Sequence, residues 1–253
     1  MGIYRTTAEF EGVGVNEFGL YLPFPKPTDK FMLQAFSTKS GTGVSIYGDH
    51  AELNSIHKTI HHFADTLDET NDAQKAQFQL LMNLAYEVRK ASNGQRLIEP
   101  FIYPGDDIKH TLYGFQLVWT DALIFLHVLR HNAGYAQSTK LHQAHLYTLE
   151  HVVEKALVDY DPVGAEAIKQ LLSRGFMMFD GYVFMLYQAL HIKFVTLKPG
   201  KTRFRKIPQL IQSHFSVSGT HHKELIASFE VSALQQNCRV TDLEFSDFPE
   251  IVW

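Results

Sequence analysis

Cysteine is nearly absent from this chain, which has 253 residues and a single cysteine, Cys238. One thiol cannot form an internal disulfide, and it cannot build a metal site from several cysteines. Strong net charge is also absent, because 23 basic and 27 acidic residues leave a formal charge of −4. The chain as a whole therefore lacks the positive charge that is typical of proteins that bind nucleic acids or anionic membranes.

Long apolar runs are missing too, so no membrane-spanning helix is predicted. The most apolar stretch, residues 175–197, contains Asp180, His191 and Lys193 and is typical of a protein core. The first twelve residues carry Glu9 and Glu11 and lack the apolar region of a secretory signal. Together with the lone thiol, these absences predict a cytoplasmic protein without a membrane partner.

Familiar catalytic motifs do not occur either. PGKT (199–202) ends like a phosphate-binding loop, but Val195 stands where that motif needs glycine. EGVGVNEFG (11–19) and SGTGVSIYG (40–48) lack the third glycine of a dinucleotide fingerprint, and no G-x-S-x-G marks a hydrolase serine. These absences favour a non-enzymatic binding or interaction protein over an enzyme, with no cofactor. Aromatic residues, at 13%, suit interfaces, so a protein partner or self-association as a dimer is predicted.

Hydrophobic periodicity predicts a predominantly helical α+β protein with a small mixed or antiparallel sheet. Residues 1–40 include the proline-rich segment LYLPFPKPTDK (20–30) and are predicted to form an extended arm or strands. Residues 41–253 are predicted to form one domain. Its sheet is expected to combine N-terminal strands with residues 110–119 and 191–197, and a further strand is expected at 240–245. Helices are expected at about 49–67, 72–91, 120–134, 138–160, 161–174, 180–190, 207–215 and 220–237.

The first predicted helix has a clear start signal. Asp49 can accept hydrogen bonds from the first helical N–H groups, and Glu52 follows three residues later, at the spacing of a capping box. Leu53, Ile56 and Ile60 then recur at helical spacing. This pattern predicts that one face of the helix is buried.

The most distinctive electrostatic feature is a segment without acids. Between Gly181 and Lys223 there is no Asp or Glu, while seven basic residues occur. Five of these lie in KPGKTRFRK (198–206), where an aromatic residue separates basic side chains. Alternating basic and aromatic groups suit nucleic acid or another phosphate-bearing partner. The predicted anion-binding residues are Lys198, Lys201, Arg203, Phe204, Arg205 and Lys206.

A second interpretation of residues 198–206 is structural. A solvated basic turn could pair its charges with acids from elsewhere in the fold, such as Glu150, Glu154 or Asp247. The sequence alone leaves both interpretations open.

Histidine is unusually frequent, with 14 residues. His57 and His61 are four positions apart and Asp65 follows after four more, so all three share one side of the predicted helix. Two imidazoles and a carboxylate could bind a divalent zinc or iron ion, which would make the chain a metal-dependent enzyme. Lys58 stands where the metalloprotease motif H-E-x-x-H has its general base. The alternative is that these histidines lie on solvated helix faces or at the edge of the core.

Three short motifs stand out beyond these patterns. They are Gly48-Asp49 within residues 43–60, Phe179-Asp180-Gly181-Tyr182 within residues 177–195, and Glu250-Ile251-Val252-Trp253 within FPEIVW (248–253). In these motifs the chain resembles a family of uncharacterised bacterial proteins that share a domain of unknown function. The likeness covers about residues 41–253. It implies a bacterial, cytoplasmic protein and assigns no catalytic residues.

Overall fold

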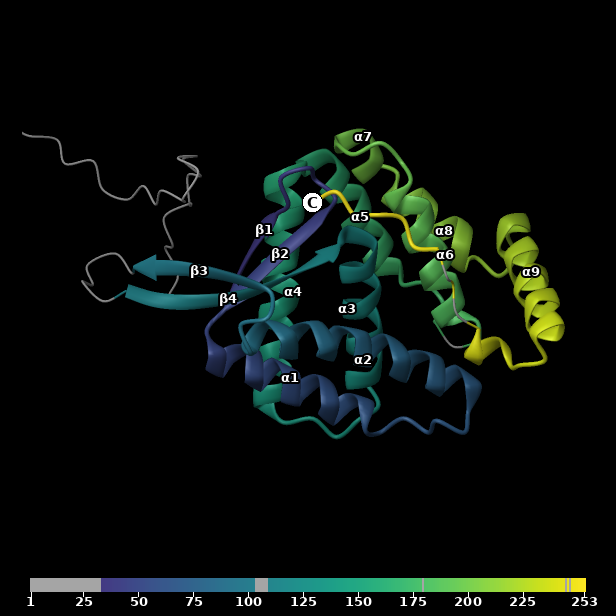
Figure 1. The fold of residues 1–253 in the computed structure, drawn as a ribbon, viewed down its shortest axis with the longest axis horizontal. Coiled ribbons are helices and arrows are strands. Elements are labelled where there is room, and N and C mark those ends of the chain that lie inside the picture. Colours follow the sequence, from purple (N-terminus) through teal and green to yellow (C-terminus); the bar gives the residue numbers. More distant parts are fainter. Residues whose placement is uncertain (1–32, 103–108, 179, 244, 246) are drawn as a thin grey trace, which may run out of the picture. The chain divides into compact units, whose positions relative to one another are not determined.

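The computed structural model describes residues 33–102, 109–178, 180–243, 245 and 247–253 (Figure 1). The segments 11–19 and 20–30 lie outside the described residues. The described part is predominantly helical and has an antiparallel sheet, so the predicted α+β class is confirmed. Its strands are β1 (Gln34–Ser37), β2 (Gly43–Gly48), β3 (Leu97–Ile102) and β4 (Lys109–Val118). Its helices are α1 (His50–Ala64), α2 (Asp72–Ser92), α3 (Trp119–Ala133), α4 (Lys140–Tyr160), α5 (Pro162–Arg174), α6 (Val183–Val195), α7 (Lys201–Phe204), α8 (Ile207–Phe215), α9 (Thr220–Gln236) and the 3-10 helix η1 (Val240–Asp242).

The sheet has the strand order β1-β2-β4-β3, and every neighbouring pair is antiparallel. Val44 of β2 lies opposite Leu117 of β4, and both side chains are buried. Helix α4 packs against β1 and β2, while α2 packs against β4. Strand β3 is at an edge, which accommodates Pro100 because an edge strand needs backbone donors on one side only. Residues 34–37, predicted as part of the N-terminal arm, form β1 and pair with β2.

Two predicted strands are wrong. Residues 191–195 continue helix α6, because Leu186, Leu190 and Phe194 follow one another at intervals of four and are all buried. Residues 240–242 form η1, and the carboxylate of Asp242 bonds to Arg239 three residues earlier, which favours a turn. Helix α6 is 13 residues long. Within the described ranges, no helix combines the length and the hydrophobicity needed to cross a membrane.

The predicted start of the first helix is confirmed. Asp49 caps α1, because its Oδ1 accepts a hydrogen bond from the backbone N–H of Glu52 at 2.7 Å. The Glu52 carboxylate accepts in turn from the N–H of Asp49 at 3.3 Å. The predicted buried face is also present, and Ile60 is 1% exposed. A cap of this kind contributes about 1 kcal/mol to helix stability.

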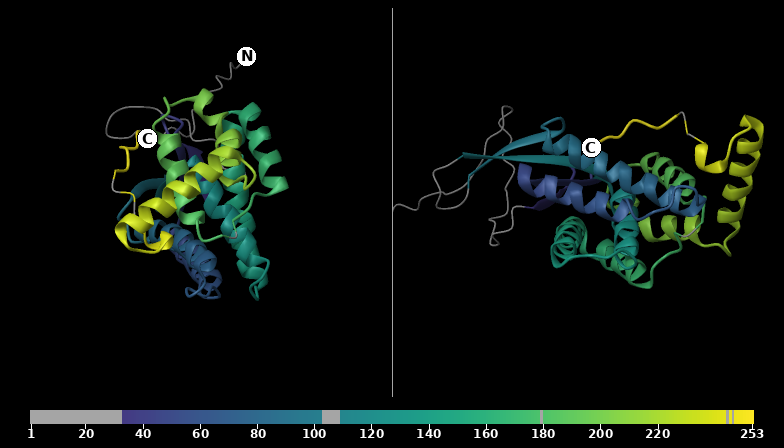
Figure 2. Two further views of the ribbon diagram at one scale, coloured as in Figure 1. Left: turned by 90° about the vertical axis from the view of Figure 1, so that its right-hand side faces the viewer. Right: turned by 90° about the horizontal axis from the view of Figure 1, so that it is seen from below.

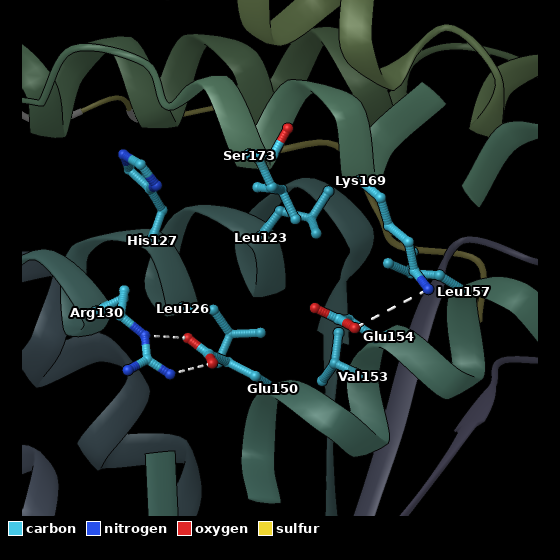
Figure 3. A pocket seen from close by; sticks show the side chains of 11 residues that line it. Leu123, Leu126, His127, Arg130, Glu150, Val153, Glu154, Leu157, Lys169 and Ser173 are labelled. Atoms are coloured by element: carbon cyan, nitrogen blue, oxygen red, sulfur yellow. Dashed lines mark hydrogen bonds and ion pairs between the residues drawn. The ribbon is translucent and has the colours of Figure 1, made fainter. Parts of the chain in front are cut away.

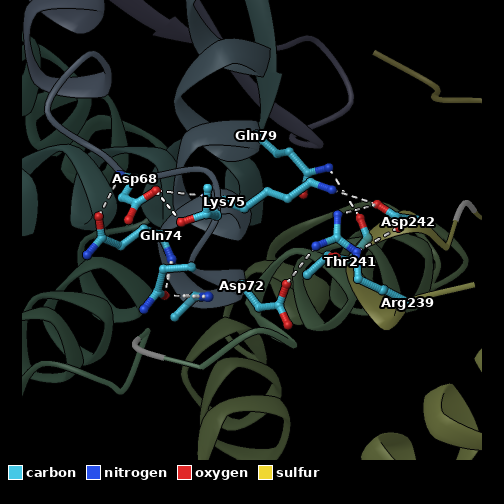
Figure 4. A network of polar contacts seen from close by, with 11 residues as sticks. Asp68, Asp72, Gln74, Lys75, Gln79, Arg239, Thr241 and Asp242 are labelled. Carbon is cyan, nitrogen blue, oxygen red and sulfur yellow. Dashed lines mark hydrogen bonds and ion pairs between the residues drawn. The ribbon is translucent and has the colours of Figure 1, made fainter.

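A polar network attaches the segment after α9 to the start of α2 (Figure 4). Asp242 pairs with Lys75 of α2 at 2.6 Å and with Arg239 at 3.0 Å. Arg239 also lies 3.5 Å from Asp72. Hydrogen bonds from Arg239 and Lys75 lower the pKa of Asp242 to about 2. Because Asp72, Arg239 and Asp242 are exposed, the network positions the segment more than it stabilises the fold.

The last described residues return to the sheet. The right-hand view of Figure 2 shows this segment running from the region of η1 and α9 back toward the strands. The hydroxyl of Ser40 donates to the backbone carbonyl of Trp253 at 2.8 Å. The hydroxyl of Thr42 donates to the carbonyl of Val252. The turn between β1 and β2 therefore holds the end of the segment in place.

Arg203 connects this turn to α6. It is 2% exposed and has no carboxylate partner among the described residues. Its Nη1 donates to the carbonyls of Leu197 at 3.1 Å and Val195 at 3.4 Å, and its Nη2 donates to the Thr42 hydroxyl at 2.7 Å. Carbonyls at a helix C-terminus lack intrahelical partners and carry partial negative charge. They can therefore stabilise the buried cation.

Replacing Arg203 tests this connection. Arg203→Met keeps an apolar stem and removes the hydrogen bonds, so we expect the free energy of unfolding to fall by about 2–3 kcal/mol. The control is Arg174→Met, in the exposed last turn of α5, which should change stability by less than about 0.5 kcal/mol. Urea denaturation measures both variants. An equal fall in the free energy of unfolding of Arg203→Met and Arg174→Met would contradict a special role for Arg203.

Candidate functional site

The predicted anion-binding segment, residues 198–206, is divided between the interior and the surface. Arg203 and Phe204 are buried, and the ring of Phe204 meets Trp119 and Tyr160 edge-on at centroid distances of 5.5 and 5.0 Å. Helix α7 explains this placement, because one helical turn directs neighbouring side chains to different sides. These two residues act inside the fold and present no surface to an anion.

The remaining basic residues of this segment are at the surface. Arg205 is already engaged, because its Nε and Nη2 bind the carboxylate of Asp161 at 2.6 and 2.9 Å. This hydrogen-bonded pair lowers the pKa of Asp161. The anion-binding prediction therefore depends on the three exposed lysines, Lys198, Lys201 and Lys206.

The predicted metal ligands lie along α1. The rings of His57 and His61 are 4.5 Å apart, and burial, His61 and Arg89 lower the pKa of His57. Asp65 is the exposed C-cap residue of the helix. In the part of the chain that the structure describes, no three His, Cys, Asp or Glu side chains are grouped so as to hold a metal ion. The structure brings two of the three residues together, and the metal site stays a prediction.

Other histidines hydrogen-bond to backbone carbonyls where helices meet. His127 Nε2 donates to the carbonyl of Phe176 at 3.0 Å, and its ring stacks on the Phe176 ring. His222 Nδ1 lies 2.6 Å from the carbonyl of His214, whose own Nδ1 lies 2.8 Å from the carbonyl of Leu210. Burial lowers the pKa of His214 to about 4. These imidazoles serve the packing of the helices through hydrogen bonds of their ring nitrogens.

A pocket of about 310 Å³ lies where α2, β4, α3, α6 and the last residues meet. We name it the Asp121 pocket. Four aromatic side chains and four polar ones contribute to its walls, and the others are aliphatic. The lining residues are Asn83, Tyr86, Glu87, Gln116, Leu117, Val118, Asp121, Phe125, Tyr187, Ile251 and Trp253.

Asp121 is the most constrained polar group of this pocket. It lies in the first turn of α3 and is 6% exposed. Its two carboxylate oxygens are 2.8 and 3.0 Å from Nδ1 of His191 on α6. Burial lowers the pKa of His191, but the charge and the hydrogen bond of Asp121 outweigh it and raise that pKa overall. The two residues therefore form a buried hydrogen-bonded pair.

Tyr187 completes the surroundings of the carboxylate. Burial raises its pKa well above the usual value, and a hydrogen bond to Asp121 adds to this shift. The phenol of Tyr187 therefore remains neutral beside Asp121. A carboxylate has about four acceptor positions. The N–H of His191 and the hydroxyl of Thr120, which lies 3.3 Å from Oδ1, use two of them, so Asp121 can accept further hydrogen bonds from a bound molecule.

Gln116 and Glu87 supply further oxygens to the walls. Gln116 Nε2 donates to the hydroxyl of Ser45 at 3.2 Å, and within the described chain its Oε1 accepts no hydrogen bond. Glu87 binds Arg96 with both oxygens, at 2.7 and 2.9 Å. The acceptors still available to a ligand are therefore Asp121 and Gln116, set among aromatic rings.

Sequence reasoning missed both Asp121 and His191. Asp121 is the only charged residue between Leu112 and Leu126. A lone acid in such an apolar stretch is a usable signal, because buried acids are almost always paired. His191 is 70 positions away, in a segment wrongly predicted as a strand. No spacing rule connects these two residues.

The fold and this pocket define a helical α+β protein with a small cavity beside β4. Residues 33–253 match a family model described as "Domain of unknown function (DUF6904)", and the chain belongs to this family. The predicted membership in an uncharacterised family is thereby confirmed, with a match that begins at residue 33 rather than at about 41. No curated protein and no solved structure matches the chain.

The pH dependence of stability tests the role of His214. The pKa of His214 is about 4 in the folded protein, against 6.5 ordinarily. Its contribution to the free energy of unfolding is therefore complete above pH 6.5 and is lost as the pH falls through 4. Between pH 6.5 and pH 4, we expect the free energy of unfolding of His214→Asn to fall by about 3 kcal/mol less than that of the wild type. The control is His151→Asn on the exposed side of α4, which should keep the wild-type slope. An unchanged slope in His214→Asn, measured by denaturation at several pH values, would contradict this role.

Proposed function

We propose that this chain is a non-enzymatic binding protein whose Asp121 pocket takes a small planar molecule that carries N–H donors. The observation that carries the proposal is the Asp121 carboxylate. It lies in the pocket wall while His191, which is not a lining residue, holds it through Nδ1. Such a carboxylate is preorganised to accept hydrogen bonds.

The aromatic walls support a flat ligand. The rings of Phe125 and Tyr187 are 5.4 Å apart at an angle of 42°, which gives the pocket one continuous aromatic side. Tyr86 is 45% exposed and forms an open edge, and Trp253 contributes a further ring. Aromatic rings stack on flat molecules, and they also attract cations. A volume of about 310 Å³ is near the lower limit for small-molecule sites, so the ligand is small.

The polar groups support a ligand with paired donors. The carboxylate of Asp121 and the Oε1 of Gln116 are acceptors in the pocket wall. An amidine or a similar planar N–H pair matches a carboxylate with two parallel hydrogen bonds. A ligand carboxylate would instead have no N–H group to donate to these acceptors.

The chemistry of the lining residues favours binding over catalysis. None of the described lining residues is a serine, threonine, cysteine or lysine. The described walls of the pocket therefore offer no aliphatic hydroxyl, thiol or amine as a nucleophile. In the acid–base pair Asp121–His191, Nδ1 of the imidazole is already engaged by both carboxylate oxygens through two short contacts.

Benzamidine is a suitable probe because it combines a flat ring with a paired N–H group. We expect it to shift the NMR signal of the Trp253 indole N–H, while benzoate does not. Trp119, the only other tryptophan, is fully buried outside the pocket and serves as an internal reference. Equal shifts at both indoles, or equal binding of benzoate, would argue against the proposed ligand class.

Two variants locate the binding site. Asp121→Asn and Tyr86→Ala should each weaken benzamidine binding by about tenfold, which corresponds to about 1.4 kcal/mol. Tyr86→Ala leaves the Asp121–His191 pair intact. Its control is Tyr135→Ala, which removes a tyrosine that is 82% exposed and lies outside the pocket. If Tyr135→Ala weakened binding as much as Tyr86→Ala, the pocket would not be the site.

A further inference from the structure

A second pocket, of about 310 Å³, lies between α3, α4 and α5 (Figure 3). Its floor is aliphatic and consists of Leu123, Leu126, Val153, Leu157 and Leu172. Figure 3 shows charged side chains on two sides of this floor, and these come from all three helices. An aliphatic floor with a few charged groups at its edge is typical of a site for an amphipathic small molecule.

One charged pair at this pocket is committed to the fold. Arg130 binds Glu150 with two hydrogen bonds, and its Nε lies 2.8 Å from Glu150 Oε1. The guanidinium also lies over the ring of Tyr147, 4.4 Å from its centre. A bidentate pair that is also stacked in this way has its hydrogen-bonding groups already engaged.

The opposite pair is loose. Lys169 Nζ is 4.0 Å from Glu154 Oε2, which is too far for a hydrogen bond. The two side chains are 39% and 50% exposed, and neither makes another hydrogen bond to the described residues. One ammonium and one carboxylate therefore stand next to each other at the edge of the pocket with their hydrogen-bonding capacity largely unused.

The remaining polar groups add no net charge. His127 donates its Nε2 hydrogen to the carbonyl of Phe176, and burial lowers its pKa, so its imidazole is neutral near pH 7. The two pairs cancel, because they contribute two positive and two negative charges. A ligand with a single net charge would thus find no excess of the opposite charge in this pocket.

From this arrangement we infer that the pocket binds an apolar α-amino acid. The ligand ammonium would pair with Glu154 and its carboxylate with Lys169, and both charges of the zwitterion would be matched. Its aliphatic side chain would lie on the floor formed by Leu126, Val153 and Leu172. The volume suits a single amino acid better than a peptide. This site shares no lining residue with the Asp121 pocket. The inference can therefore be tested independently of the proposed function.

The test compares L-leucine with two analogues that each lack one charge. Isothermal titration of the full chain should give binding of L-leucine. It should also give binding at least fivefold weaker for 4-methylpentanoate, which lacks the ammonium, and for 3-methylbutylamine, which lacks the carboxylate. Binding of 4-methylpentanoate at least as tight as that of L-leucine would identify a site for anions and overturn the inference. So would the absence of L-leucine binding up to about 10 mM.

Variants of the loose pair test the same point on the protein side. Glu154→Gln and Lys169→Gln should each weaken L-leucine binding by about fivefold or more. Leu126→Trp, which fills the floor, should abolish it. The matched control is Lys155→Gln, which removes an exposed lysine of α4 that pairs with Asp159 and does not line the pocket. Tighter binding in Glu154→Gln, or unchanged binding in both variants of the pair, would overturn the inference, provided that thermal unfolding shows each variant to be folded.

Discussion

Moving a guanidinium into a protein interior is costly unless its N–H groups find acceptors. Both terminal nitrogens of Arg203 find them without a carboxylate, while its Nε has no hydrogen-bond partner among the described residues. Its acceptors are the carbonyls at the end of α6 and the hydroxyl of Thr42. Thr42 donates in turn to the carbonyl of Val252, next to Trp253 in the wall of the Asp121 pocket. The pocket therefore depends on a residue that does not line it.

The local signals in the sequence described much of the fold. The cap at Asp49 and the periodicity after it were sufficient to predict α1, because a capping box and a buried face are determined within one helix. The end of α6 was mispredicted, because Ile192, Phe194 and Val195 have high strand propensity. Packing of the helix against its neighbours outweighs that preference, and only tertiary contacts reveal it.

The basic segment shows why charge patterns are harder to interpret. Arg203, Phe204 and Arg205 are consecutive, yet the first two are buried and the third pairs with Asp161. A count of charges along the chain treats these residues as one surface. The single helical turn that contains them directs two of the side chains into the interior and the third to the surface. The candidate site was harder still, since the Asp121–His191 pair joins two helices that no motif connects. Asp121 stands out as a lone acid in an apolar stretch, but its partner His191 is not evident until the carboxylate and the imidazole are placed in space.

The composition of the Asp121 pocket also has a consequence for synthesis on the ribosome. Most of its lining residues lie between 83 and 187, but Ile251 and Trp253 also line it. Because a chain emerges from the exit tunnel in order, α2, α3 and α6 can pack against one another before these last wall residues are available. A nascent chain thus lacks part of the wall of this pocket until Ile251 and Trp253 have been synthesised.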